Sequence, residues 1–389
     1  MVSDKDTPFI VFGAPDIHNE EIDEIVATLH SGWIGTGPRV AQFEQDFAAV
    51  KAVGQDQVAA VNSCTAALHV SMIAAGLKPG DEVLTTAMTF CATANAIIHA
   101  GATPVLVDID PLTLNIDTTQ LEQRITPRTR AIVPVHFAGL PCEMDRIMAV
   151  AATNNLLVIE DCAHAIETQW RGQHAGTLGD FGCFSFYVTK NVVTGEGGMV
   201  LARSPEMIDR IKVLALHGMS KDAWSRFSDD GYKHYEVVAA GFKYNMMDLQ
   251  AALGIHQLRR MEQNWLRRRE IWQRYQQVFA DLPAGCPAEP EDHMRHAYHL
   301  YTLSIDERDC GISRDSFIDR MSDAGIGVGV HYRSLAQQPY YQERFNWRPE
   351  DFPVSTAFGN NTVSLPLGPS LDDADVHRIT DTVSAILAK

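Results

Sequence analysis

The feature that most constrains this chain is a regular alternation, from about residue 57 onward, of short apolar runs with helical segments. The runs with the length and composition of buried strands are 58–61, 82–85, 104–107, 131–135, 156–159, 182–186 and 199–202. Helical segments such as 65–75 and 142–153 separate them. This order is typical of a mostly parallel sheet with helices on its faces. The sequence therefore predicts an α/β fold.

The pattern changes after Gly241. In chain order the later segments are a long helical connector (247–263 and 265–279), a linker with three Pro and one Gly (282–291), an alternating strand (296–305) and a last helix (372–388). We therefore predict two domains. Residues 1–262 form an N-terminal arm with a large domain, and residues 263–389 form the connector with a smaller C-terminal α/β domain.

Charge and cysteine content exclude several classes of protein. Lys and Arg number 32 against 49 Asp and Glu, a net charge of −17, so the surface repels nucleic-acid phosphates. Seven cysteines without CxxC pairing fit a reducing compartment, and the first residues do not resemble a signal peptide, so we expect a cytoplasmic protein. The uncharged stretches 58–77 and 87–107 hold many polar residues, which predicts buried strands and helices and no membrane partner.

Polar residues follow four of the predicted strands, where ligands bind in open α/β sheets. The segments are NSCTAA at 62–67, TF at 89–90, EDCAH at 160–164 and FSFYVTKNVVTGEGG at 184–198. Small and hydroxyl residues at a helix start either hold a phosphate through free backbone amides or simply cap the helix. Phe90 either stacks on a ligand ring or packs in the core.

Lys190 follows the apolar run FGCFSFYV and precedes a Gly-rich turn. Desolvation there lowers the pKa of a lysine and leaves free amine to attack a carbonyl, whereas an isolated lysine is more often a surface residue. Ser185 stands five residues before Lys190 and Asp161 stands 29 before it, so a hydroxyl, a carboxylate and an amine come from neighbouring strand ends. These groups match the needs of pyridoxal 5′-phosphate (PLP).

Nine segments, in order, carry a family resemblance: SGWIGTGPRVAQFE, NSCTAALH, TFCATANAI, PVLVDID, IEDCAHAI, GDFGCFSFYVTKNVVTGEGGMV, HGMSKDAW, GFKYNMMDLQAALGIHQL and GIGVGVHY. In this order they resemble the sugar aminotransferases of the DegT/StrS family. These are fold-type I PLP enzymes, similar in fold to aspartate aminotransferase, that aminate keto-sugars attached to nucleotides. The resemblance spans nearly the whole chain and implies that the large domain binds PLP.

The resemblance also implies roles for single residues. Lys190 would form the Schiff base with PLP and shuttle a proton, and Asp161 would pair with the pyridinium nitrogen. His164 would lie near the cofactor's phenolic oxygen, at a place where the family usually has Gln. The implied contacts to the phosphate and the ring are those of Thr65, Ala66, Ser185 and Phe90.

In such families a second subunit completes the site, so the resemblance implies a homodimer with shared active sites. The segment GFKYNMMD would reach across, and many members read G-Y-N-Y-R there. This chain has Lys243 and Asn245 instead, a variant similar to the UDP-4-amino-4-deoxy-L-arabinose aminotransferase group, and either residue is a candidate for the partner's phosphate site.

Substrate residues are predicted in two further places. His331 and Arg333 lie near the HY pair, where related enzymes often carry another His and this chain has Ala336. Arg226 is a candidate for a nucleotide pyrophosphate. For both arginines the alternative is an ordinary surface position. His293, His296 and His299 would alternate faces in the predicted strand, so we expect no metal site.

We therefore predict a PLP-dependent aminotransferase that moves an amino group from an amino acid, by resemblance glutamate, to a nucleotide-linked 4-keto sugar by a ping-pong mechanism. A free keto-sugar such as an 8-oxo octulosonate is the alternative substrate, and a non-catalytic PLP-fold sensor is a second alternative. Related sugar 3-dehydratases carry His where this chain has Lys190. A nicotinamide dehydrogenase would need a G-x-G-x-x-G fingerprint, which the sequence lacks.

Overall fold

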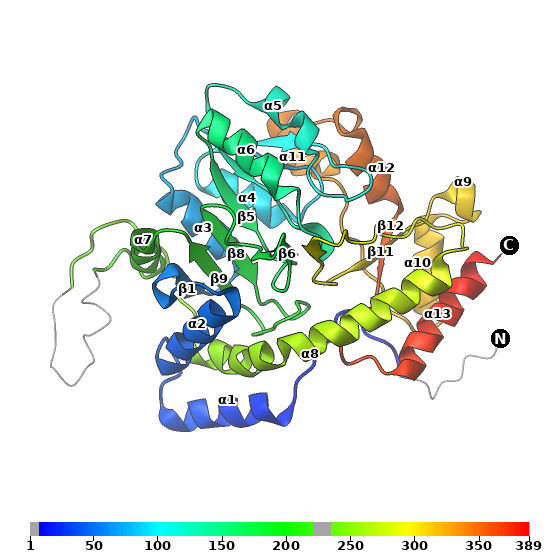
Figure 1. Ribbon diagram of the computed structural model, residues 1–389, viewed down its shortest axis with the longest axis horizontal. Coiled ribbons are helices and arrows are strands. Elements are labelled where there is room, and N and C mark those ends of the chain that lie inside the picture. The colour runs from blue at the N-terminus through cyan, green and yellow to red at the C-terminus, as the bar shows by residue number, and fades with distance from the viewer. Residues whose placement is uncertain (1–7, 221–234, 389) are drawn as a thin grey trace.

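A seven-stranded sheet forms the centre of the computed structural model, which describes residues 8–220 and 235–388 (Figure 1). In spatial order its strands are β1 (Val58–Val61), β9 (Gly198–Ala202), β8 (Phe181–Ser185), β5 (Leu157–Asp161), β4 (Thr129–Val133), β2 (Glu82–Thr86) and β3 (Thr103–Val107). All pairings are parallel except those of β9, which runs antiparallel to β1 and β8. The predicted α/β fold with a mostly parallel sheet is confirmed, and the seven predicted strands end within two residues of the observed bounds.

Helices cover both faces of this sheet, which is why its strands are nearly continuous in apolar residues. On one face lie α3 (Cys64–Ala74), α4 (Cys91–His99) and α7 (Pro205–Ala215). On the other face lie α2 (Pro38–Lys51), α6 (Met144–Asn154) and the first half of α8 (Asp248–Phe279). The carboxyl ends of the parallel strands therefore open onto one edge between two helical layers.

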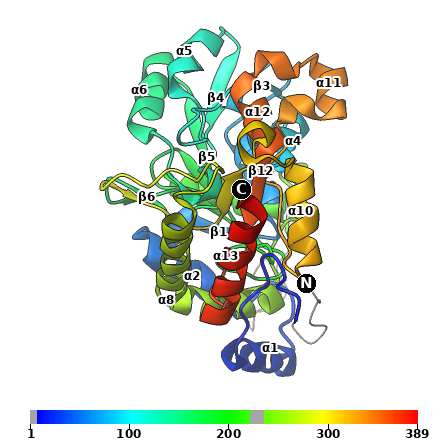
Figure 2. The ribbon, with the colours of Figure 1, turned by 90° about the vertical axis from the view of Figure 1, so that its right-hand side faces the viewer.

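The helix α8 connects the sheet to a second, smaller core (Figure 1). This core contains β11 (Tyr301–Ser304), β12 (Thr362–Leu365), α10 (Arg314–Asp323) and α13 (Asp373–Leu387). Figure 2 shows α10 and α13 side by side on the face turned to the viewer. The second half of α8 joins the core from Ile271 onward. The connector is one uninterrupted helix across the predicted boundary at 262/263, and the two-domain division stays a prediction.

Shorter elements complete the described chain. They are α1 (Asn19–Ser31), α5 (Leu121–Arg124), β6 (Gln169–Trp170), β7 (Gln173–His174), β10 (Met294–Arg295), α9 (Glu307–Cys310), α11 (Pro339–Phe345) and α12 (Pro353–Asn361), with 3-10 turns between them. Within residues 8–220 and 235–388, the helices lack the combination of length and apolarity that crossing a bilayer requires.

The predicted strand at 296–305 is wrong in its first half, since β11 begins at Tyr301. Tyr298 has a φ of 49°, and its amide donates to Nδ1 of His296 (2.6 Å), which turns the chain out of an extended path. The amides of Ala297 and His299 then donate to the carbonyls of Gly139 and Ala138, in a turn that follows β4. The alternation of faces expected for the three histidines therefore does not occur.

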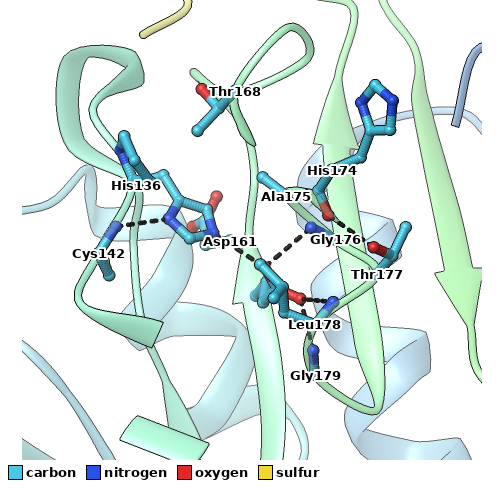
Figure 3. Close-up of polar contacts among 12 residues, drawn as sticks. His136, Cys142, Asp161, Thr168, His174, Ala175, Gly176, Thr177, Leu178 and Gly179 are labelled. Atoms are coloured by element: carbon cyan, nitrogen blue, oxygen red, sulfur yellow. Dashed lines mark hydrogen bonds and ion pairs between the residues drawn. The ribbon is translucent and has the colours of Figure 1, made fainter. Parts of the chain in front are cut away.

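Glu160, the residue before Asp161 in β5, is a fully buried carboxylate. Its Oε1 accepts hydrogen bonds from the amides of Leu178 (2.9 Å) and Gly179 (2.6 Å). Its Oε2 accepts from the amide of Gly176 (2.8 Å). These three amides converge from one turn, as Figure 3 shows, and so they attach the end of β5 to the loop that precedes β8.

His136 supplies the fourth donor to this carboxylate, through Nε2 to Oε2 (3.0 Å). The amide of Cys142 donates to Nδ1 of the same ring (3.0 Å; Figure 3), so the proton in the hydrogen bond to Glu160 is carried by Nε2. Among the described residues, His136, Glu160 and Cys162 have the spacing of metal ligands, with ligand atoms within 4.8 Å. Because hydrogen bonds occupy the Glu160 oxygens and both His136 nitrogens, we assign this cluster a structural role.

Glu160→Gln is expected to lower the free energy of unfolding by about 2–5 kcal/mol. The NH₂ group of the glutamine would take the place of one carboxylate oxygen, and because it is a donor it could not accept the hydrogen bonds of the backbone amides there. Urea unfolding of the apoprotein followed by circular dichroism measures the change. Glu122→Gln, at an exposed position, is the matched control and should change it by less than about 0.5 kcal/mol. Equal unfolding midpoints for the two variants would contradict the structural role.

Candidate active site

A cavity of about 510 Å³ lies at the carboxyl ends of the central strands, a size ordinary for a small-molecule site. It is lined from six parts of the chain: the start of α3, the start of α4, the residues after β4, the end of β5, the end of β8 with the loop that follows, and the segment before residue 335. The side chains with polar or aromatic groups include Ser63, Thr65, Thr89, Phe90, Thr93, Asp161, His164, Ser185, Tyr187, Thr189, Lys190, Glu196, His331 and Tyr332.

Lys190 lies in the loop between β8 and β9, where its amide donates to the carbonyl of Tyr187 (2.8 Å). The amide of Thr194 closes the loop on the carbonyl of Phe186 (2.8 Å). Burial lowers the pKa of Lys190 to about 8, while Cys64 and Asp161 oppose the shift. A share of the amine is therefore unprotonated near neutral pH, as nucleophilic attack on a carbonyl requires.

Asp161 ends β5 and is 3% exposed. Its Oδ2 accepts a hydrogen bond from Oγ1 of Thr93 (2.8 Å), and its Oδ1 accepts from the amide of Ala163 (3.1 Å). Burial raises the pKa of Asp161, while these hydrogen bonds and Lys190 oppose the shift. A carboxylate held here is costly without a positive partner, so the position favours a ligand that presents a cationic group.

His164 lines the same cavity with both ring nitrogens engaged. The amide of Ala138 donates to Nδ1 (3.3 Å), and Nε2 lies 3.1 Å from the hydroxyl of Tyr332. Burial, together with the charges of Lys190 and His331, holds the pKa of His164 well below its usual value. The ring is therefore neutral.

A buried polar chain supports this wall of the cavity from behind. Nδ2 of Asn191 donates to Oε2 of Glu167 and to the carbonyl of Ala297, both at 2.9 Å. Oδ1 of Asn191 is therefore the acceptor for Nδ1 of His299, also at 2.9 Å. The His299 ring lies against the His164 ring, with centroids 4.4 Å apart. The residue next to Lys190 thus joins its loop to the C-terminal half of the chain.

The start of α3 forms the anion-favouring end of the cavity, because the first amides of a helix have no intrahelical partner. Thr65 and Ser185 line it. A Cβ on Gly198 would come within 2.5 Å of the Ser63 carbonyl, so only glycine lets β9 pass this close. Ala66 does not line the cavity, and its amide donates to Oγ of Ser63 (3.1 Å), the helix cap.

The other predicted site residues divide between the cavity and the surface. Phe90 is at the cavity, 57% exposed, and His331 lines it with Nδ1 bonded to Oγ of Ser364 (2.8 Å). Burial and the charge of Lys190 lower the pKa of His331 to about 4.

The predicted residues that lie elsewhere are Arg333 and Lys243, both exposed, and Asn245, whose Nδ2 donates to Oγ1 of Thr36 (2.7 Å). Arg226 lies outside the described residues.

The residues at this site that were not predicted include Thr93, Asn191, His299 and Tyr332. Tyr332 stood in the HY pair and Asn191 directly follows Lys190, but neither position alone indicated a contact. Their partners are distant in sequence: Tyr332 contacts His164 and Asn191 contacts His299, at separations of 168 and 108 residues. Local pattern carries no signal for such pairs.

The donor set fits PLP. Lys190 offers an amine with a lowered pKa, Asp161 offers a buried carboxylate that favours a cationic partner, and the start of α3 offers amides and hydroxyls for a phosphate. With the mostly parallel sheet, these features define a fold-type I PLP enzyme.

Comparisons with known proteins give the family. The model of the DegT/DnrJ/EryC1/StrS aminotransferase family matches residues 15–384. The spore coat polysaccharide biosynthesis protein SpsC of Bacillus subtilis is 49% identical over 380 residues, covering 97% of each chain. The PLP form of a putative sugar aminotransferase from Streptococcus pneumoniae is 33% identical, with a TM-score of 0.89 and coverage of 97% and 98%. Helicobacter pylori PseC, an aminotransferase involved in the biosynthesis of pseudoaminic acid, is 26% identical with a TM-score of 0.89, covering 97% and 99%.

This chain therefore belongs to the DegT/DnrJ/EryC1/StrS aminotransferase family. It is a PLP-dependent sugar aminotransferase, and its cofactor is PLP.

Proposed function

We propose that this chain moves an amino group from glutamate to the carbonyl carbon of a nucleotide-linked 4-keto sugar by a ping-pong mechanism. The observation that carries the proposal is that Lys190 and Asp161, from different strand ends, line one cavity with His331 and Tyr332 from the C-terminal half. An amine and a carboxylate there serve the amino-group chemistry, and the C-terminal side chains serve sugar recognition.

Bound PLP supplies an electron sink for the carbon that loses its proton. Nζ of Lys190 takes the α-proton from the amino donor in the first half-reaction and returns a proton to the sugar carbon in the second. A lysine with a pKa of about 8 suits both directions, because neither protonation state is strongly disfavoured near neutral pH. Asp161 keeps a proton on the ring nitrogen of PLP through its negative charge.

For the remaining contacts we propose the roles that the resemblance implies. Thr65, Ser185 and the nearby amides hold the phosphate, Phe90 covers the ring, and His331 meets the sugar. Arg333 is exposed on the same segment as His331 and reaches the substrate only if a ligand extends out of the cavity.

The similarity to SpsC supports a place in polysaccharide biosynthesis. The narrower substrate, a UDP-4-keto-pentose, is supported by the residues Lys243 and Asn245 alone.

We further propose that the enzyme is a homodimer with shared active sites. Ile22, Val26 and Leu29 form an apolar stripe along α1 and are 51%, 45% and 54% exposed. Trp33 and Ile34, in the loop after α1, are also about half exposed. Such a contiguous patch is typical of a subunit interface. Full activity in a demonstrably monomeric preparation would contradict this assembly.

Of the two candidates for the partner's phosphate site, we propose Lys243. Its side chain is exposed, whereas the Asn245 amide is bonded to Thr36 of its own chain. We also propose a cytoplasmic location, supported by the scattered positions of the seven cysteines, of which only Cys286 is exposed among the described residues.

The test offers keto-sugars to the enzyme loaded with the pyridoxamine form of the cofactor and follows the return of the PLP absorption band. The panel contains a UDP-4-keto-pentose, a dTDP-4-keto-hexose, a nucleotide-linked 3-keto sugar and a free 8-oxo octulosonate. We expect the nucleotide-linked 4-keto sugars to react at least about tenfold faster. Reaction with the free sugar alone would favour the alternative substrate, and no reaction with either amino donors or keto-sugars would favour a sensor.

A further inference from the structure

We propose that Tyr332 is a catalytic residue whose hydroxyl donates a hydrogen bond to an oxygen atom of the group bound beside Lys190. The proposal rests on the proposed function for the identity of that group, which is either PLP or the keto-sugar. It is argued from the direction of the hydrogen bonds around His164, the position at which this chain differs from the usual Gln of its family.

The proton on His164 can be located from its neighbours. A backbone amide can only donate, so the Ala138 amide, 3.3 Å from Nδ1, makes that nitrogen an acceptor. The ring is neutral, because burial and two nearby basic groups disfavour its cation. The single ring proton is therefore on Nε2, the nitrogen that lies 3.1 Å from the Tyr332 hydroxyl.

The direction of the His164–Tyr332 hydrogen bond follows. Nε2 donates and the Tyr332 oxygen accepts, so the hydroxyl proton of Tyr332 is not used in this bond. Burial keeps the pKa of Tyr332 well above its usual value, so the proton stays on the oxygen. Tyr332 and Lys190 line the same cavity, and the remaining hydroxyl proton is thus available to an acceptor bound there.

The surroundings hold Tyr332 and His164 in this arrangement. The Tyr332 ring contacts Phe90 and Phe137, with centroids 5.9 and 6.3 Å apart. His299, fixed through its Nδ1 by Asn191, packs against the His164 ring. Because neither ring can turn freely, the hydroxyl is pre-organised, and a donor aimed at developing negative charge is worth most when it needs no reorganisation.

Tyr332→Phe tests the proposal, because it removes the hydroxyl and keeps the ring contacts. The first measurement is the pH midpoint at which the absorption band of bound PLP changes, which needs no turnover. If the acceptor is an oxygen of PLP, the midpoint should move upward by about one unit or more, because a donor to that oxygen stabilises the more negative form.

The second measurement is the rate at which the pyridoxamine-loaded enzyme reacts with keto-sugar. If the acceptor is the sugar oxygen, the midpoint stays as in the unchanged protein and the maximal rate falls about 10- to 100-fold, with a smaller change in KM. An unchanged midpoint together with an unreduced sugar rate overturns the proposal. Failure of the unchanged protein to aminate any sugar would contradict the proposed function. In that case an upward shift of the pH midpoint in Tyr332→Phe would still support the role of Tyr332, and an unchanged midpoint would overturn it.

His164→Asn provides a second variant. The Asn side chain keeps a polar atom at the position of Nδ1 but has none at Nε2, so Tyr332 loses the donor that orients it. We expect the quantity that changes in Tyr332→Phe, either the pH midpoint or the rate with keto-sugar, to change in the same direction in His164→Asn. The effect of the double variant should be smaller than the sum of the two single effects, because both substitutions act on the hydrogen bond from Tyr332 to the acceptor oxygen. Fully additive effects would overturn the proposed coupling.

Discussion

Lys190→Ala is expected to lower the rate of transamination by at least about 10⁴-fold, because it removes both the nucleophile and the proton carrier. Stopped-flow measurement of the half-reaction with the amino donor gives the rate. The substitution should leave the fold intact, since the side chain of Lys190 lines the cavity and is not part of the apolar core. A variant that transaminates normally would refute the assignment.

Lys51 is the natural comparison for this experiment. Burial lowers the pKa of Lys51 to about 8, as it does for Lys190. Nζ of Lys51, however, donates to the carbonyls of Ile166 (2.8 Å) and Ala175 (3.2 Å) in the interior and does not line the cavity. Borohydride reduction of the PLP-loaded protein should therefore attach the cofactor to the peptide with Lys190 and leave the peptide with Lys51 unchanged.

The pH dependence of cofactor uptake follows from the same lowered pKa. The unprotonated amine forms above a pKa of about 8, so the rate of PLP uptake by the apoprotein should rise with pH through that value. A rise centred near 10.5, the ordinary lysine value, would show that Lys190 is not desolvated.

Asp161→Asn is expected to lower the transamination rate by about 10²- to 10⁴-fold, the second large effect. The amide can keep the hydrogen bonds to Thr93 and Ala163, but it lacks the charge that would hold a proton on the ring nitrogen of PLP. Thr93→Val is the matched control: it removes one hydrogen bond and keeps the charge, so we expect a loss of about tenfold or less.

The stability of the Asp161→Asn apoprotein shows whether its lower transamination rate comes from the lost charge or from misfolding. Because the pKa of Asp161 is raised in the folded state, the folded protein binds that proton more tightly than the unfolded chain does. This contribution to stability is lost as the pH rises from the pKa of Asp161 in the unfolded chain through its higher pKa in the folded protein. The Asp161→Asn apoprotein should therefore unfold at an equal or higher temperature than the unchanged apoprotein at neutral pH. A lower unfolding temperature would show that the lost activity reflects damage to the fold.

Local pattern was sufficient for the sheet and for the positions of Asp161 and Lys190 beyond the apolar strands. A strand buried on both faces must be apolar throughout, so its end is visible in the sequence, and Asp161 stands at such an end. Lys190 is visible for a similar reason, as a charge between an apolar strand and a glycine-rich turn. The strand at 296–305 was predicted wrongly because the alternation of apolar residues continues where the backbone turns at Tyr298.

The sequence by itself determined the fold class, the approximate strand ends and the positions of a lysine and an aspartate beside such ends, because each of these depends on neighbours within a few residues. Only the tertiary structure decided that Tyr332 meets His164, that Asn191 holds His299, that Asn245 is bonded within its own chain and that the Ala66 amide is bonded to Ser63, the cap of α3. Apart from that cap, these contacts join residues more than a hundred positions apart, and the direction of each hydrogen bond depends on what else its partner already binds.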